Sequence, residues 1–169
     1  MKYFSGFSLA NEQELFAPYL IVSDFNVAGF SYGAIKALEY AFTCKERIDT
    51  LQLFSPAFFE DRDLRFKKLQ TLSFTKNSTA YCEAFLNNVA TPSTTDMTPY
   101  FQQGSAEELY ELLYYVWDAR KLQALCERGV KIEVYLGECD AIINAFTCKD
   151  FFVPFASVYY FKRVGHILQ

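Results

Sequence analysis

Residues 29–33 read Gly-Phe-Ser-Tyr-Gly and place Ser31 between two small residues. The segment stands where an extended apolar stretch, residues 26–30, meets a stretch of helical character that runs to about residue 44. A Gly-x-Ser-x-Gly sequence at such a junction is typical of a sharp strand-to-helix turn, in which the flanking residues must be small and the serine hydroxyl is lifted clear of the sheet. Ser31 is therefore a candidate nucleophile.

A serine hydroxyl is a weak nucleophile at neutral pH unless a base accepts its proton. The chain has a single histidine, His166, which follows Gly165 behind the last predicted strand, and Asp140 follows Gly137 behind the preceding one. In such a set Ser31 attacks an acyl carbon and His166 takes its proton and returns it to the leaving group. Asp140 holds the imidazole and stabilises its charged form. These three residues are the predicted catalytic set.

The tetrahedral intermediate of acyl transfer carries a negatively charged oxygen, which needs preorganised hydrogen-bond donors. The backbone N–H of Tyr32, at the start of the predicted helix, is expected to supply one donor. The backbone N–H of Phe7, in the loop after the first predicted strand, is expected to supply the other.

Each residue of the set also has a plainer interpretation. Ser31 alone is equally compatible with a turn residue between glycines that permit close strand-helix packing. Asp140 alone fits a turn or a helix cap better, and His166, near the end of the chain, fits a disordered tail. The catalytic interpretation depends on the three contexts together, each behind a strand and in the order Ser, Asp, His.

The elements that must position these residues alternate between strand and helix. Strands that alternate with helices favour an α/β fold with a mostly parallel sheet, helices on both faces and right-handed crossovers. The carboxyl ends of parallel strands open onto one crevice, so the candidate residues are expected to meet there. Extended segments are predicted at residues 2–5, 20–22, 26–30, 48–54, 130–136 and 157–161.

Two helical regions complete the prediction. Asn11, with Glu14 three residues later, predicts a capping box at the start of an early helix. Residues 58–123 show helical segments without a convincing strand, interrupted at 91–98 by a polar stretch rich in Thr, Ser and Pro. We therefore expect a helical cap, residues 58–123, inserted into a core formed by residues 1–57 and 124–169.

The composition of the chain argues against several classes of protein. The 169 residues suit one domain, and 16 basic against 20 acidic side chains give a net charge of −4 without a basic tract that could follow nucleic acid. Five cysteines without Cys-x-x-Cys spacing suggest neither a disulfide framework nor a zinc site, and favour a reducing cytoplasm. No cofactor or metal is indicated. No apolar run is long enough to cross a membrane, and the first ten residues are interpreted as strand and loop rather than signal peptide.

The order Ser31, Asp140, His166 and the strand-end context of each residue resemble the α/β-hydrolases. The loop Ser5-Gly6-Phe7 is similar to the His-Gly-aromatic loop that this family often has in the same place. The resemblance implies a minimal α/β-hydrolase fold. The chain begins at the strand of that loop, and residues 19–29 are too short for a normal helical crossover, so strand number and order are expected to differ from those of the family.

Residues 3–7, 29–37 and 53–56 resemble the compact pimeloyl-acyl-carrier-protein methyl ester esterases of bacterial biotin synthesis. This resemblance implies hydrolysis of the methyl ester of a pimeloyl chain bound to acyl carrier protein, with release of methanol. The same catalytic set suits a thioesterase or a general short-acyl esterase. A hydrolase fold that serves only as a binding module is the alternative outside enzymes. The sequence does not predict the oligomeric state.

A carrier-bound acyl chain needs an apolar groove beneath the cap. Candidate lining residues are Phe58, Phe59, Phe74, Phe85, Tyr114 and Trp117, with Tyr110 and Leu113 beside them. Residue by residue, a place in the cap core is the stronger interpretation. Carrier proteins are acidic, so docking calls for cations near the mouth of the groove. The densest basic cluster is Arg62, Arg65, Lys67 and Lys68, for which an ordinary solvated helix face is the competing interpretation.

Overall fold

The computed structural model describes residues 1–169 and is built around one sheet with the strand order β1-β2-β3-β4-β5. Every neighbouring pair is parallel, which confirms the predicted α/β fold. The register sets Phe30, Phe54 and Tyr135 side by side, so three adjacent strands reach the same edge of the sheet. The strands are β1 (Lys2–Phe4), β2 (Asn26–Phe30), β3 (Thr50–Phe54), β4 (Lys131–Gly137) and β5 (Ser157–Phe161).

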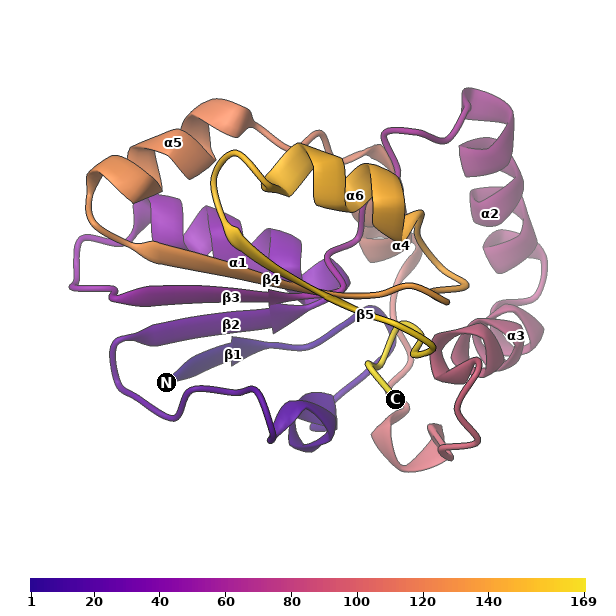
Figure 1. Ribbon diagram of the computed structural model, residues 1–169. Coiled ribbons are helices and arrows are strands. Elements are labelled where there is room, and N and C mark those ends of the chain that lie inside the picture. The colour runs from indigo at the N-terminus through magenta and orange to yellow at the C-terminus, as the bar shows by residue number, and fades with distance from the viewer.

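Three helices, α1, α5 and α6, cover one face of the sheet (Figure 1). In α1 the residues Ala34, Ala37, Leu38 and Ala41 are buried, and they recur at the spacing of a single helical face. The helices are α1 (Tyr32–Thr43), α2 (Leu64–Lys76), α3 (Ser78–Ala90), α4 (Ala106–Tyr114), α5 (Ala119–Glu127) and α6 (Ala145–Phe152), with two 3-10 helices, η1 (Glu12–Phe16) and η2 (Thr98–Tyr100).

The other face of the sheet packs against η1, the carboxyl end of α3 and the last residues of the chain. Phe16 of η1 lies against Phe30 and Phe54, with ring centroids 4.8 and 4.7 Å away. The connections β1–β2 and β2–β3 step across the sheet in the same direction, yet η1 and α1 lie on opposite faces (Figure 1).

Those two connections therefore have opposite hands, so the prediction of right-handed crossovers is wrong for one of them. The preference for one hand arises when a crossover helix packs back onto a twisted sheet. The β1–β2 connection contains only the five-residue η1, which buries a single large ring against the sheet. The preference for right-handed crossovers therefore does not apply to the β1–β2 connection, which has no α-helix to pack on the sheet.

The predicted capping box at Asn11 does not form. Asn11 has left-handed backbone geometry, with φ of 63°, and its side chain makes no capping hydrogen bond. A helix cap of this kind needs extended backbone at the capping residue. A 3-10 helix therefore follows Asn11 in place of the predicted α-helix, and the neighbouring Glu12 is fully buried.

Residues 20–22 form no strand, in contrast to the prediction. The N–H of Ile21 donates to Gln52 Oε1 at 2.9 Å, and its carbonyl accepts from Asn26 Nδ2 at 2.7 Å. Side chains of β2 and β3 thus satisfy the backbone groups that a further strand would pair. Gln52 Nε2 also donates to Glu133 and Tyr135, so a buried polar network ties this segment to the sheet.

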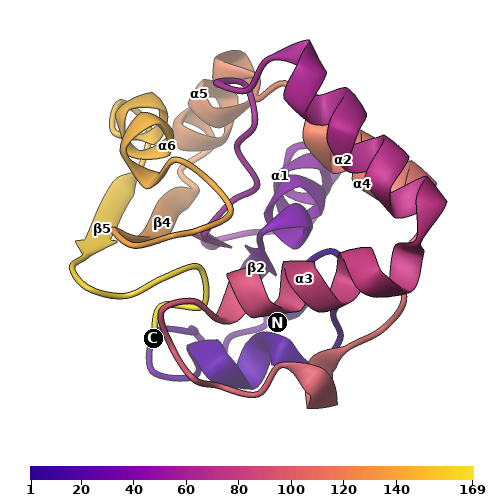
Figure 2. The ribbon, with the colours of Figure 1, turned by 90° about the vertical axis from the view of Figure 1, so that its right-hand side faces the viewer.

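Helices α2, α3 and α4 lie beyond the carboxyl ends of the strands (Figures 1 and 2). α2 packs against both α3 and α4, and no strand occurs between β3 and β4. Helix α5 begins within the range expected for the cap, but it packs against α1 and β4 in the layer that covers the sheet. The site must therefore lie between the strand ends and the three helices α2, α3 and α4.

No helix combines the length and the apolar character needed to cross a membrane. All five cysteines are free thiols, and no three or more His, Cys, Asp or Glu side chains gather in a group that could hold a metal ion.

Candidate active site

Ser31 occupies the turn between β2 and α1 with strained backbone geometry. Its φ of 52° and ψ of −114° lie outside the regions that a residue with a side chain ordinarily adopts. The Ser31 N–H donates to the carbonyl of Phe54 at 2.8 Å, and its carbonyl accepts from Ala57 at 3.1 Å. Such strain persists only where the surroundings fix the backbone, and it occurs most often at functional sites.

The two glycines of the segment are required by close backbone contacts. A Cβ at Gly29 would lie 2.2 Å from the carbonyl oxygen of Gly33, and a Cβ at Gly33 would lie 2.0 Å from that of Phe4. Both partners are backbone atoms, which cannot turn away as a side chain can. The absence of side chains at both positions lets α1 approach the ends of β1 and β2.

Asp140, behind β4, is held in a fixed orientation. Its Oδ1 accepts the N–H groups of Ile142 and Ile143 at 2.8 and 3.0 Å. Its Oδ2 lies 2.6 Å from Nδ1 of His166, and both side chains are fully buried. Because a carboxylate only accepts, this pairing assigns the proton of a neutral imidazole to Nδ1 and leaves Nε2 as a free acceptor.

Nε2 of His166 is buried and has no hydrogen-bond partner. The ring lies 4.9 Å from that of Phe30, the residue before Ser31, and the His166 carbonyl accepts from the Ser55 hydroxyl at 2.6 Å. No hydrogen bond joins His166 to Ser31 in this structure. Hydrogen bonds between catalytic groups are often long in unliganded sites and tighten when substrate binds.

Glycines also permit the approach of the two loops that carry Asp140 and His166. A Cβ at Gly137 would lie 2.2 Å from the carbonyl oxygen of Gly165, so the loop before His166 packs directly on the end of β4. This contact brings Asp140 and His166 together, although they are 26 positions apart in the chain.

The predicted oxyanion donors are the backbone amides of Tyr32, which follows Ser31, and of Phe7, which lines the same cavity as Ser31. Tyr32 is the first residue of α1, where N–H groups have no acceptor within the helix. The N–H of Phe7, in the buried loop after β1, has no acceptor in the protein. Buried backbone N–H groups without a partner are rare, so this one is available to a ligand.

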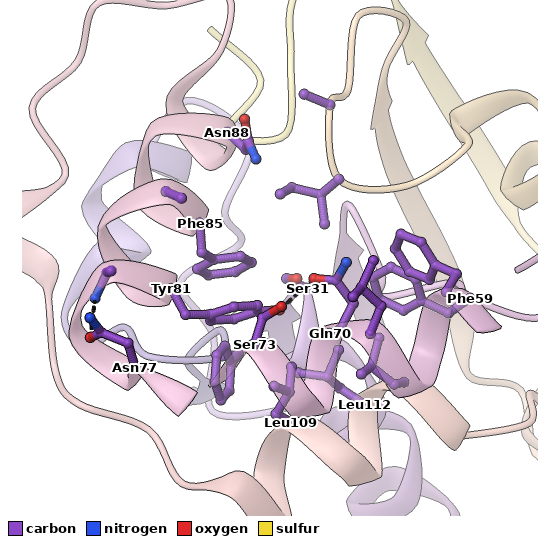
Figure 3. Close-up of a pocket in the computed structure, with 18 of the residues that line it drawn as sticks. Ser31, Phe59, Gln70, Ser73, Asn77, Tyr81, Phe85, Asn88, Leu109 and Leu112 are labelled. Carbon is purple, nitrogen blue, oxygen red and sulfur yellow. Dashed lines mark hydrogen bonds between the residues drawn. The ribbon is translucent and has the colours of Figure 1, made fainter. Parts of the chain in front are cut away.

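A mostly apolar cavity of about 580 Å³ opens onto Ser31 (Figure 3). Tyr81 and Phe85 lie on one side of Ser31 and Phe59 on the other. Burial raises the pKa of Tyr81 to about 12, so its phenol is neutral at ordinary pH and donates to Gln70 Oε1 at 2.9 Å. The cavity is lined by Phe7, Ser31, Phe59, Phe66, Leu69, Gln70, Ser73, Lys76, Asn77, Ala80, Tyr81, Ala84, Phe85, Asn88, Leu109, Leu112, Leu113, Ala141 and Ile142.

Of the six candidate lining residues, Phe59 and Phe85 line the cavity. Phe74 lies behind the wall, with its ring 5.9 Å from that of Phe7. Tyr114 also lies outside the lining and stacks on Tyr110 at 4.3 Å.

The two remaining candidates, Phe58 and Trp117, also pack away from the cavity. The Phe58 ring lies 5.4 Å from that of Phe151. The indole of Trp117 lies 5.0 Å from Phe152 and donates to the carbonyl of Ala57 at 3.0 Å. Both therefore join the cap to the helix layer of the sheet.

One wall of the cavity was missed by reasoning from the sequence. Phe66, Leu69, Gln70, Ser73 and Asn77 all line it and come from α2 or the residue that follows it. Their spacing of three and four residues defines one face of a helix. This spacing is visible in the sequence, but the face mixes apolar and polar side chains and therefore does not stand out as a pocket wall.

The basic cluster lies at the start of α2. The Arg62 guanidinium is 3.7 Å from Asp61 and packs over Phe66, whereas Lys67 lies over the ring of Tyr114. Arg65 and Lys68 are exposed and form no ion pair, and α2 contains no acidic residue. Two of the four candidate docking residues are thus free to meet a partner.

No protein family model matches the sequence, and no curated protein matches it. Solved structures match by fold. An esterase from Exiguobacterium antarcticum gives a TM-score of 0.62 at 16% identity, over 82% of this chain and 58% of the other. A structure from work on carboxylesterases of Nitrososphaera gargenis gives 0.58 at 18% identity, over 83% and 57%.

MenH from S. aureus matches over 99% of this chain and 87% of its own length, with a TM-score of 0.59 at 14% identity. At these identities the likeness shows the fold alone, and that fold is the α/β-hydrolase fold. The chain spans little more than half the length of the two esterase structures.

Proposed function

We propose that this protein is a serine hydrolase of carboxylic esters, with Ser31 as nucleophile, His166 as base and Asp140 as the residue that orients His166. The observation that carries the proposal is the buried Asp140–His166 pair, whose Nε2 has no partner and whose ring packs beside the turn that bears Ser31. A buried polar atom without a partner is costly, and a catalytic role is one of the reasons for which proteins keep such an atom.

In the proposed reaction the Ser31 hydroxyl loses its proton to His166 Nε2 as Oγ bonds to the carbonyl carbon of the ester. The N–H groups of Tyr32 and Phe7 stabilise the resulting oxyanion. His166 then gives the proton to the departing alcohol, which leaves an acyl group on Ser31. Water, activated by the same imidazole, releases the acid. Asp140 stabilises the imidazolium form in both steps.

The proposed substrate is the methyl ester of a pimeloyl chain on acyl carrier protein, with methanol as the first product. The resemblance of residues 3–7, 29–37 and 53–56 to the pimeloyl-carrier methyl ester esterases suggests this ester, and the apolar cavity at Ser31 suits a long acyl chain. Exposed Arg65 and Lys68 beside the cavity wall suit an acidic carrier. A thioesterase, or an esterase of short acyl chains, is the alternative that the same groups allow.

The test is a comparison of three substrates with purified protein: pimeloyl-carrier methyl ester, a p-nitrophenyl butyrate ester and an acyl-carrier thioester. We expect methanol release from the first with kcat/KM at least about a hundredfold above that for the small ester, because the carrier and the chain add binding contacts. Faster thioester cleavage would favour a thioesterase, and equal rates on small esters a general esterase.

Growth gives an independent readout. The gene should restore biotin-independent growth to a bacterial strain that lacks its own methyl esterase, and the Ser31→Ala variant should not. Failure of the wild-type gene, with protein expressed and active on small esters, would refute the specific substrate and leave the hydrolase proposal standing.

A further inference from the structure

Glu12 is a fully buried carboxylate beneath the loop that follows β1. Buried acidic side chains are almost always paired with a cation, yet Glu12 forms no ion pair. Its Oε1 accepts the backbone N–H of Gly6 at 2.9 Å and the hydroxyl of Tyr3 at 3.2 Å. Its Oε2 has no partner. A buried carboxyl oxygen without a partner is costly, which points to a function for this side chain at the loop.

The bond from Gly6 to Glu12 fixes the turn that presents the amide of Phe7. The carbonyl of Gly6 accepts from Leu9 at 3.2 Å, so the N–H and the carbonyl of Gly6 are both held. In a trans peptide the carbonyl of one residue and the N–H of the next point in opposite directions. The orientation of the Gly6 carbonyl therefore sets the direction of the Phe7 N–H.

The loop has little space for an alternative arrangement. A Cβ at Gly6 would lie 3.0 Å from the ring of Phe30, and Ser8 has left-handed backbone with φ of 55°. The Phe7 N–H itself has no acceptor in the protein. Glu12 is the only side chain that hydrogen-bonds to the backbone of residues 6–8, so its Oε1 is the anchor of this turn.

We propose that Glu12 is a positioning residue, which holds the Gly6–Phe7 peptide in the orientation that lets the Phe7 N–H meet the oxyanion. The inference rests on the proposed function of the site. Glu12 does not line the cavity, so we do not expect it to contact a substrate bound there. Its effect must therefore fall on the transition state and leave ground-state binding unchanged.

The experiment compares Glu12→Ala, Glu12→Gln and the matched control Tyr3→Phe, with p-nitrophenyl butyrate as substrate and thermal melting as the test of folding. Glu12→Ala should lower kcat by about 10- to 100-fold with KM changed less than about threefold, because one oxyanion donor is misplaced. Glu12→Gln keeps an oxygen acceptor for Gly6 and should recover most of the loss. Tyr3→Phe removes only the other partner of the carboxylate and should stay within about threefold of wild type.

Inhibition by an alkyl trifluoromethyl ketone separates positioning from general loosening of the structure. This ketone forms a tetrahedral adduct with serine, so its Ki should rise in Glu12→Ala by the same factor by which kcat falls. Should Glu12→Ala not fold, Glu12→Asp takes its place, because it keeps the charge but shortens the reach to Gly6.

A folded Glu12→Ala or Glu12→Asp variant with kcat within about threefold of wild type would overturn the inference, as would a Ki that does not follow kcat, or a Glu12→Gln variant as impaired as Glu12→Ala. Wild-type protein without any ester hydrolysis would remove the proposed function and this inference together. Active wild type with unimpaired variants would remove the inference alone.

Discussion

At the scale of single residues, the site combines a strained serine with an imidazole nitrogen that has no partner. Both features carry an energetic cost, of order 1–3 kcal/mol each. Asp140 limits the freedom of His166 by fixing one ring nitrogen, while its own second oxygen is held by two backbone amides. Of the side-chain nitrogen and oxygen atoms of this pair, only His166 Nε2 therefore has no hydrogen-bond partner.

Replacing Asp140 tests this assignment. Asp140→Asn presents an amide, whose N–H₂ group opposite Nδ1 would favour the wrong imidazole tautomer. We expect kcat for p-nitrophenyl butyrate to fall by about four orders of magnitude with KM little changed. His166→Ala should lose a similar factor. Activity within tenfold of wild type in either folded variant would remove that residue from the mechanism.

The glycines of the turn give a prediction about stability. Gly33→Ala places a methyl group against the carbonyl of Phe4 and should destabilise the fold by at least about 3 kcal/mol in urea denaturation. Gly129→Ala is the matched control, since its φ of 81° is unfavourable for alanine but nothing lies within 4 Å of the new Cβ. It should cost only about 1–2 kcal/mol. Equal losses would contradict the close-contact explanation.

At the scale of elements, the buried network around Gln52 replaces the pairing of a missing strand. Burial raises the pKa of Glu133, but hydrogen bonds from Lys131, Tyr135 and Gln52 outweigh burial and leave the pKa below its ordinary value. A carboxyl with a lowered pKa stabilises the folded protein above its unfolded pKa. That contribution is lost as the pH falls through the folded pKa.

Glu133→Gln should therefore lower the free energy of unfolding at pH 7 and reduce its dependence on pH below about 4.5, the ordinary pKa of the group. Urea denaturation at a series of pH values measures both effects. Glu46→Gln, on an exposed loop, is the control and should follow wild type. An unchanged acid dependence in Glu133→Gln would show that Glu133 does not contribute to it.

Helix α2 forms one cavity wall and carries the exposed Arg65 and Lys68, which would meet the carrier under the proposed function. Arg65→Glu combined with Lys68→Glu should raise KM for the pimeloyl-carrier ester by at least about tenfold and leave p-nitrophenyl butyrate unaffected. The single reversal Lys45→Glu, on the segment that follows α1 at the opposite end of the sheet, should change KM for neither substrate. A rise in KM for both substrates would indicate damage to the cavity instead.

Most elements were predictable because their signals are local. The alternating residues of β4 and the small residues around Ser31 fix a strand and a turn regardless of distant contacts. The segment around Ile21 was not predictable, because its backbone partners are side chains of Asn26 and Gln52. Asn11 was misjudged for a similar reason, since the geometry of the loop overrides its preference for a helix cap.

At the scale of the whole molecule, the parallel sheet brings three loops to one edge. Helices α2, α3 and α4 lie beyond that edge (Figure 2) and contribute most of the residues that line the cavity. Strand ends could be located in the sequence, so the pairing of Asp140 with His166 was accessible to prediction. The residues that line the cavity could not be predicted in the same way. Phe74 and Trp117 are large and apolar, as pocket residues often are, but they are buried and do not line the cavity. Which side of a cap helix faces inward depends on its neighbours.

The most direct test of the account is labelling with a fluorophosphonate probe, which reacts with a serine only when a base and an oxyanion site activate it. Intact mass spectrometry of the folded protein should show one adduct, and peptide mapping should place it on Ser31. Ser31→Ala and heat-denatured protein should gain none. A folded wild-type protein that stays unlabelled, or a Ser31→Ala variant labelled at the wild-type rate, would contradict the claim that Ser31 is an activated nucleophile.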